Sequence, residues 1–113
     1  MASLTLNLLQ GSVSFRYTPE AAQSLKQEID QLMQSLKMIA ATVAKGERAQ
    51  KQPTMEYRYT GEIFLEVFCN PNIYPSPFAA KVLLTVRDDR IRLTTEAELP
   101  RLLEDLGQYL EQN

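Results

Sequence analysis

A long run of apolar residues at helical spacing limits the fold of this chain more than any other feature. The row consists of Ala22, Leu25, Ile29, Leu32, Leu36, Ile39 and Val43. Its alternating intervals of three and four residues predict an amphipathic helix. Thr18 and Pro19 suit the N-cap and first helical position, and Gly46 suits the end. Such a helix has about 26 residues and is ~39 Å long, whereas a five-stranded sheet is only ~24 Å wide. We therefore expect it to pack on a sheet and to extend beyond it.

Residues 4–17 predict a β-hairpin, because apolar and polar side chains alternate on both sides of Gln10-Gly11. A two-residue turn there places all six apolar side chains on one face. The pairs that result are Leu8 with Val13, Leu6 with Phe15, and Leu4 with Tyr17.

Residues 55–69 give the clearest strand pattern, with apolar side chains on one parity and mainly polar ones on the other. A fold-back through a two-residue turn at Thr60-Gly61 would pair opposite parities. We therefore expect one long strand that bends at Gly61. The proline-rich segment 70–77 then ends the strand, because proline lacks the backbone donor that a ladder requires.

Residues 82–93 predict a second hairpin with a two-residue turn at Asp88-Asp89. This turn pairs Val86 with Ile91, and Leu84 with Leu93. The spacing of Thr95 to Glu98 matches a capping box, so a last helix is expected to begin near Glu96.

These elements predict an α+β fold in the order ββαβββα, forming a single domain over residues 1–113. A mainly antiparallel sheet of about five strands is expected, with the long helix and the C-terminal helix packed on one face. The residues expected to form that core face are Leu6, Phe15, Leu65, Leu84 and Leu93.

The composition argues against most enzyme classes. The 113 residues include no histidine and one cysteine, which excludes histidine-dependent triads, histidine metal sites and internal disulfides. Cys69 is interpreted as a small buried hydrophobe, and Tyr57 and Tyr59 as core residues. We expect a protein that is not an enzyme and has no cofactor and no metal.

The charge balance argues against nucleic acid as a partner. The chain has 12 Lys and Arg and 14 Asp and Glu, which give a net charge of −2. A protein that binds the phosphate backbone needs a surplus of positive charge. The longest apolar run with helical potential, residues 38–44, is far shorter than the ~20 residues that span a bilayer. No membrane span and a cytoplasmic location are expected.

Two surfaces are candidates for binding a protein partner. By strand parity, one set of residues points away from the core, and its arginines would favour an acidic partner. This set consists of Arg58, Phe64, Phe68, Leu83, Arg87, Arg90 and Arg92. A second set lies in or beside the proline-rich loop and either binds a partner or closes the core. It consists of Ile73, Tyr74 and Phe78.

Two segments resemble parts of small cyanobacterial and plastid accessory proteins: Met55–Glu62 and Leu93–Leu103, about a fifth of the chain. At the level of fold class the chain also resembles secretion-type and assembly chaperones, although those begin with a helix and this chain with a hairpin. The resemblance carries over no functional residue and implies a cytosolic accessory role in assembling a larger complex.

The leading functional hypothesis is a non-catalytic interaction or assembly factor, chaperone-like, that binds a protein partner. The alternative is a small apolar-ligand-binding domain with a pocket between the long helix and the sheet, lined by Met33, Tyr57 and Tyr59. We also expect weak homodimerisation through the long helix, because its 3-4 repeat resembles a coiled-coil seam. The residues of that seam are Leu32, Leu36, Ile39 and Val43.

Overall fold

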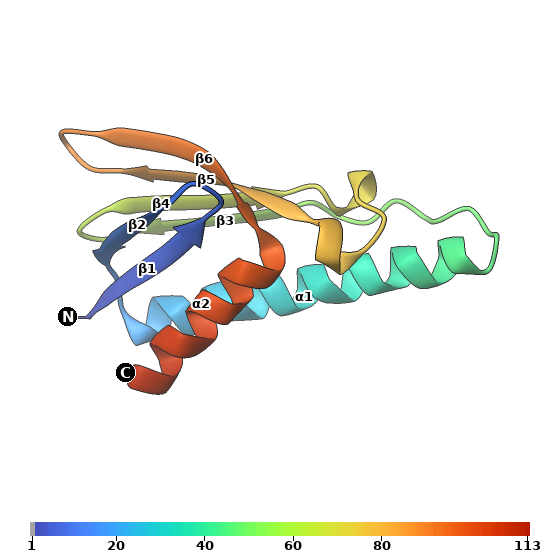
Figure 1. Cartoon of the computed structure of the whole chain (residues 1–113), viewed down its shortest axis with the longest axis horizontal. Helices are drawn as coiled ribbons and strands as arrows, with labels where there is room; N and C mark the ends of the chain where they lie inside the picture. Colours follow the sequence, from blue (N-terminus) through green and yellow to red (C-terminus); the bar gives the residue numbers. More distant parts are fainter. Residues whose placement is uncertain (1) are drawn as a thin grey trace.

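The computed structural model describes residues 2–113, so Met1 lies outside it. It confirms an α+β fold, in the order ββαββββα (Figure 1). The elements are β1 (Ser3–Leu8), β2 (Gly11–Arg16), α1 (Pro19–Ala44), β3 (Met55–Thr60), β4 (Phe64–Cys69), β5 (Lys81–Arg87), β6 (Arg92–Glu98) and α2 (Leu99–Gln112). Two short 3₁₀ turns, η1 (Pro71–Ile73) and η2 (Pro77–Ala79), lie between β4 and β5.

The strands form two antiparallel sheets. β1 and β2 make a two-stranded sheet, and the other four strands make a sheet in the order β3-β4-β5-β6. Figure 1 shows both helices on one side of the four-stranded sheet. β1 packs against α2 and also approaches β6.

The long helix forms as predicted. The Thr18 hydroxyl accepts a hydrogen bond from the Ala21 N–H at 3.1 Å, which caps the first turn. The helix ends at Ala44, and Gly46 follows with a φ of +77°. Its C-terminal end extends past the strands, and the segment between α1 and β3 runs back alongside it (Figure 1). The helix and this returning segment give the molecule its long axis.

The first hairpin turns one position earlier than predicted. The turn is Leu9-Gln10, so Leu8 pairs with Gly11, Leu6 with Val13 and Leu4 with Phe15. Gly11 has a φ of +141°, a conformation that favours glycine. The predicted and observed pairings differ by two residues, and a shift of two leaves every side chain on its face. The apolar pattern is therefore compatible with both the predicted and the observed pairing.

The single long strand predicted over residues 55–69 is wrong. Instead, β3 and β4 form a hairpin in which Tyr59 pairs with Leu65, and Tyr57 with Val67. The loop has three residues, 61–63. With an odd number of loop residues, residues of the same parity lie opposite each other, so the apolar side chains of both strands share one face. A two-residue turn would pair opposite parities. The Tyr59 ring packs against Gly61, where a Cβ atom would collide with it. A larger residue at position 61 would have to displace the Tyr59 ring, which favours glycine here.

The second hairpin has a four-residue loop rather than a two-residue turn. Val86 pairs with Leu93, and Leu84 with Thr95. The Asp88 carboxylate accepts hydrogen bonds from the N–H groups of Arg90 at 2.8 Å and Ile91 at 2.9 Å, which stabilises this loop.

The last helix begins later than predicted. β6 continues to Glu98, and α2 starts at Leu99 with no side-chain cap. The capping-box spacing is overridden because residues as far as Glu98 still have partners on β5, ending with Lys81 opposite Glu98. A continued ladder satisfies these backbone groups without an N-cap.

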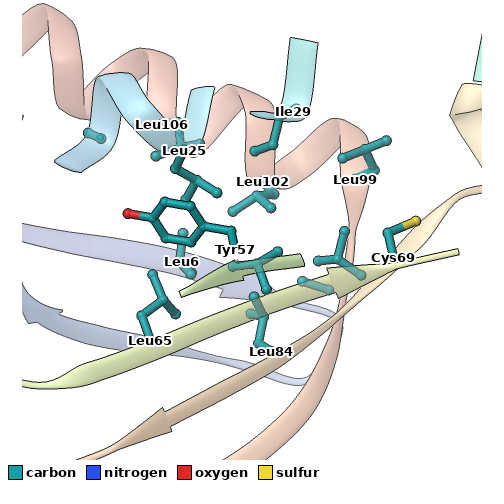
Figure 2. Close-up of a cluster of buried hydrophobic side chains, with 14 of the residues drawn as sticks. Leu6, Leu25, Ile29, Tyr57, Leu65, Cys69, Leu84, Leu99, Leu102 and Leu106 are labelled. Carbon is teal, nitrogen blue, oxygen red and sulfur yellow. The ribbon is translucent and has the colours of Figure 1, made fainter. Parts of the chain in front are cut away.

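One hydrophobic cluster takes side chains from both helices and all six strands. Figure 2 shows Leu25 of α1 and Leu102 of α2 facing Leu65 and Leu84 of the sheet, all fully or almost fully buried. Of the predicted core face, Leu6, Phe15, Leu65 and Leu84 are buried. Leu93 is 37% exposed, which corrects the prediction. It lies near the start of the edge strand, away from α2.

Candidate functional site

The side of the four-stranded sheet opposite the helices is the candidate site, and we call it the outer face. In residues 2–113, no helix lies over it (Figure 1). Along β4 the inward side chains Leu65, Val67 and Cys69 are buried, while the alternating Phe64 and Phe68 are partly exposed. Strand parity alone thus sorts these side chains onto the correct faces.

Phe68 and Leu83 form an apolar pair on the two central strands, toward the end of the outer face that adjoins the proline-rich segment. They lie directly opposite each other on β4 and β5, and Leu83 is 43% exposed. A surface pocket of about 200 Å³ next to the pair is also lined by Ile73 and Tyr74 from the proline-rich segment. The structure therefore unites part of each predicted set in one place, which we call the outer-face pocket.

The rim of the outer-face pocket carries one charge of each sign, from Lys81 and Glu96. The sequence interpretation did not include either residue. The signal was present, because Lys81 shares the outward parity of Leu83 and Glu96 is the cross-strand partner of Leu83. The choice of residues rested on aromatic and arginine side chains, so this rim was missed.

Phe64 and three arginines gather at the opposite end of the outer face. The Arg87 guanidinium lies 4.4 Å from the centroid of the Phe64 ring, a cation–π contact. Arg92 is the cross-strand partner of Arg87, and Arg90 lies in the adjoining loop. All three arginines are exposed, and so are Asp88 and Asp89 of the same loop, so this end of the face carries only a small surplus of positive charge.

Arg58 is on the outer face, but its charge is already matched. Its Nε donates to a Glu66 carboxylate oxygen at 2.7 Å. This hydrogen bond, together with the charge of Glu66, raises the pKa of Arg58. Such an exposed ion pair contributes little to the stability of the fold. Because Glu66 offsets the charge of Arg58, this arginine attracts an acidic partner less strongly.

Phe78 is not part of the outer-face pocket. It lies on η2, which packs near α2, and its side chain is 86% exposed. The structure therefore separates Phe78 from Ile73 and Tyr74, with which the sequence interpretation grouped it.

The single thiol is poorly suited to nucleophilic chemistry at neutral pH. Cys69 faces the core (Figure 2) and is buried, and burial raises the pKa of its thiol to about 11. The residues described in the structure include no group of three or more His, Cys, Asp or Glu side chains placed to hold a metal ion. No described helix is long and apolar enough to cross a membrane.

The tyrosines considered for a ligand pocket are engaged within the core. The Tyr57 hydroxyl lies 2.6 Å from that of Tyr17, and both contact the Ala21 carbonyl oxygen at 3.3 Å. Tyr59 and Met33 pack against the core cluster. None of the surface pockets described for residues 2–113 is lined by Met33, Tyr57 or Tyr59.

The chain matches none of the protein-family models, curated proteins or solved structures with which it was compared.

Proposed function

We propose that this protein is a non-catalytic accessory factor that binds a protein partner through the outer-face pocket. The observation that carries the proposal is the pocket itself. Phe68, Leu83, Ile73 and Tyr74 present apolar surface at one place on a sheet face that no helix covers. Exposed faces of antiparallel sheets normally carry polar side chains, so an apolar cluster here needs a reason.

The size of the pocket favours a protein over a small molecule. Its volume of about 200 Å³ is below the ~300–1,000 Å³ typical of small-molecule sites. A pocket of this size would accommodate one apolar side chain of a partner, and the other contacts would lie on the flatter surface around the pocket. An aromatic and aliphatic centre with the charged rim of Lys81 and Glu96 matches the usual anatomy of protein interfaces.

The arginine end of the outer face favours an acidic partner surface. Arg87, Arg90 and Arg92 lie within one hairpin whose loop also carries Asp88 and Asp89, so residues 87–92 have a surplus of one positive charge. A local field of this sign favours docking of an acidic surface even though the net charge of the chain is −2. A cytoplasmic location is part of the proposal, because a chain with one cysteine and no disulfide is typical of a reducing compartment. The ligand-binding alternative has less support, because hydrogen-bonded tyrosines fill its predicted site.

Affinity capture with matched variants tests the proposal. Leu83→Asp places a charge in the outer-face pocket, whereas Gln34→Asp places one on the exposed side of α1. The wild type and Gln34→Asp should retain the same protein, and Leu83→Asp should reduce its retention at least tenfold. Thermal melting checks that all three remain folded. Equal retention by a folded Leu83→Asp variant would show that the partner binds elsewhere.

A further inference from the structure

We propose that the free edge of β6 pairs in an antiparallel manner with β6 of a second copy of this chain. β6 is one edge of the four-stranded sheet and has seven residues. It contains no proline, and its pairing with β5 is continuous from Arg92 to Glu98, without a bulge. Regular edge strands of this length are templates for further pairing unless such features block them. This interaction uses the backbone edge of β6 rather than the outer-face pocket, although Arg92 and Glu96 of this strand also belong to the outer face.

The hydrogen-bond pattern shows which backbone groups are directed away from β5. At one end of the β5–β6 ladder the Asp88 N–H donates to the Ile91 carbonyl oxygen at 3.0 Å. At the other end the Leu99 N–H donates to the Ala80 carbonyl oxygen, also at 3.0 Å. Because hydrogen-bonded and non-bonded pairs alternate, the backbone groups of Thr94 and Glu96 point outward, and those of Thr95 point toward β5.

Charge along β6 selects the second copy as the occupant. The strand begins with Arg92 and ends with Glu98. Antiparallel pairing centred on Thr95 sets Arg92 of one copy opposite Glu98 of the other, twice by symmetry. In this register Thr94 lies opposite Glu96, so outward-directed backbone groups meet each other. Parallel pairing of two copies in register would instead bring like charges together.

Dimerisation also relieves an unfavourable pair within each copy. Arg92 lies directly opposite Arg87 on the outer face, and like charges at such positions are destabilising. Glu98 of the second copy would lie on the other side of Arg92 and offset this repulsion. The free chain shows no ion pair for Arg92 among its described residues.

A groove lies beside the inner side of the β6 edge. A groove of about 530 Å³ lies between β6 and the tip of the first hairpin, lined in part by Leu8, Leu9, Leu93 and Thr95. Leu9 and Leu93 are exposed there. In the proposed register Leu93 of the second copy lies opposite Ala97, beside this groove. The Leu93 side chain of the second copy would cover apolar surface that is exposed to water in a single copy.

The long helix offers less surface for self-association than the sequence suggested. The chain itself buries Leu32, Leu36 and Ile39 of the predicted seam, and only Val43 of that row is exposed, at 58%. Dimerisation through α1 stays a prediction, and Val43→Asp distinguishes it from pairing at β6. A seven-residue strand pair is a small contact, so we expect a weak, reversible dimer.

Sedimentation equilibrium of two charge-reversal variants, alone and mixed, tests the proposal. The wild type should approach twice its 12.9 kDa mass between micromolar and millimolar concentration, and Val43→Asp should do the same. Arg92→Glu and Glu98→Arg should each remain monomeric, because like charges then face each other at two positions. Mixed in equal amounts they should form a heterodimer, because both cross-strand pairs become complementary again.

A backbone variant tests the same contact without changing charge. Thr94→Pro removes an N–H directed away from β5, so it should abolish dimerisation and leave the ladder to β5 intact. Thr94→Ala is its control and should dimerise like the wild type. A wild type that is monomeric throughout would overturn the proposal. So would a dimer that persists in folded Thr94→Pro, or monomers in a mixture of two folded charge-reversal variants.

Discussion

Asp105 is the buried charge that joins the last helix to the first hairpin. Its carboxylate accepts hydrogen bonds from the Asn7 backbone N–H at 2.8 Å and from Asn7 Nδ2 at 2.9 Å. Arg101 Nε lies 3.5 Å from the same carboxylate. Asp105 sits within the apolar stripe of α2, next to Leu106, and a carboxylate at such a position is the sequence signal that it has a structural partner. The sequence interpretation did not use this signal.

Replacing Asp105 should destabilise the protein far more than replacing its exposed neighbour. Asp105→Ala leaves the partly buried polar groups of Asn7 without their acceptor, a loss of about 1–3 kcal/mol. Glu104→Ala, one position earlier, should change the free energy of unfolding by less than about 0.5 kcal/mol. Urea denaturation measures both values. Equal stability of the two variants would show that Asp105 does not hold the hairpin.

Burial of tyrosine and cysteine side chains should make the protein sensitive to high pH. Burial raises the pKa of Tyr17 and Tyr57 above the ordinary 10.0, and that of Cys69 from 9.0 to about 11. The folded state therefore favours the neutral forms. This contribution to stability is complete below about pH 9 and is lost as the pH rises through the range in which the unfolded chain ionises.

Thermal melts across pH should show this loss. With no histidine in the chain, we expect a nearly constant Tm from about pH 6 to pH 8 and a steady fall above about pH 9. Tyr17→Phe should make the fall shallower, because one buried ionisable group is gone. A Tm that stays constant to about pH 11 would contradict this interpretation.

At the scale of elements, the sequence predicted which face of a strand or helix is buried better than it predicted the loops between strands. The N-cap at Thr18 and the glycine at Gly46 located the long helix because both ends have local chemical signals. Each hairpin loop was misjudged, because a register shift of two residues leaves every side chain on the same face. The loop after Thr60 was missed for a related reason, since only a two-residue turn was considered there.

The Asn72 side chain links the connection between α1 and β3 to η1. Asn72 accepts a hydrogen bond from the Gln52 N–H and donates one to the Gln52 carbonyl oxygen, both at 2.8 Å. This pair fixes η1 against the segment that returns from the long helix. The proline-rich segment therefore has a structural role at Asn72 as well as apolar side chains at the outer-face pocket.

Loss of this clamp should expose the returning segment to trypsin. Asn72→Ala removes both hydrogen bonds to Gln52, so cleavage after Lys45, Arg48 or Lys51 should become at least several-fold faster. Ile73→Ala changes an exposed neighbour in the same 3₁₀ turn and is the control. Limited proteolysis followed by mass spectrometry gives the rates and sites. Identical cleavage of both variants would show that the segment is held in another way.

At the scale of the whole molecule, two adjacent leucines define the two faces of the sheet. Leu84 is fully buried against the helices, and Leu83 is on the outer face (Figure 2 shows Leu84). Leu84→Asp buries an unpaired charge and should cost about 4 kcal/mol or more, enough to unfold a small domain. Leu83→Asp, which also faces Glu96 across the strands, should cost about 1–2 kcal/mol. Circular dichroism melts of both variants check this, and similar melting of the two would contradict the assignment of faces.

The candidate site could be predicted only in part from the sequence. Alternation assigned Phe68 and Leu83 to one face, because strand parity is a local property. Their union with Ile73 and Tyr74 depends on how the proline-rich segment folds back, which no local pattern encodes. The internal pairing of Arg58 depends on the β3–β4 hairpin, which was not predicted.

Site-specific photo-crosslinking tests the role of the outer face most directly. A photoreactive residue at Ile73, which lines the outer-face pocket, is compared with one at Met38, an exposed position on α1. Both are applied to the protein that the wild type captures. We predict a covalent adduct from Ile73 and none from Met38. An adduct from Met38 and none from Ile73 would contradict binding at the outer face.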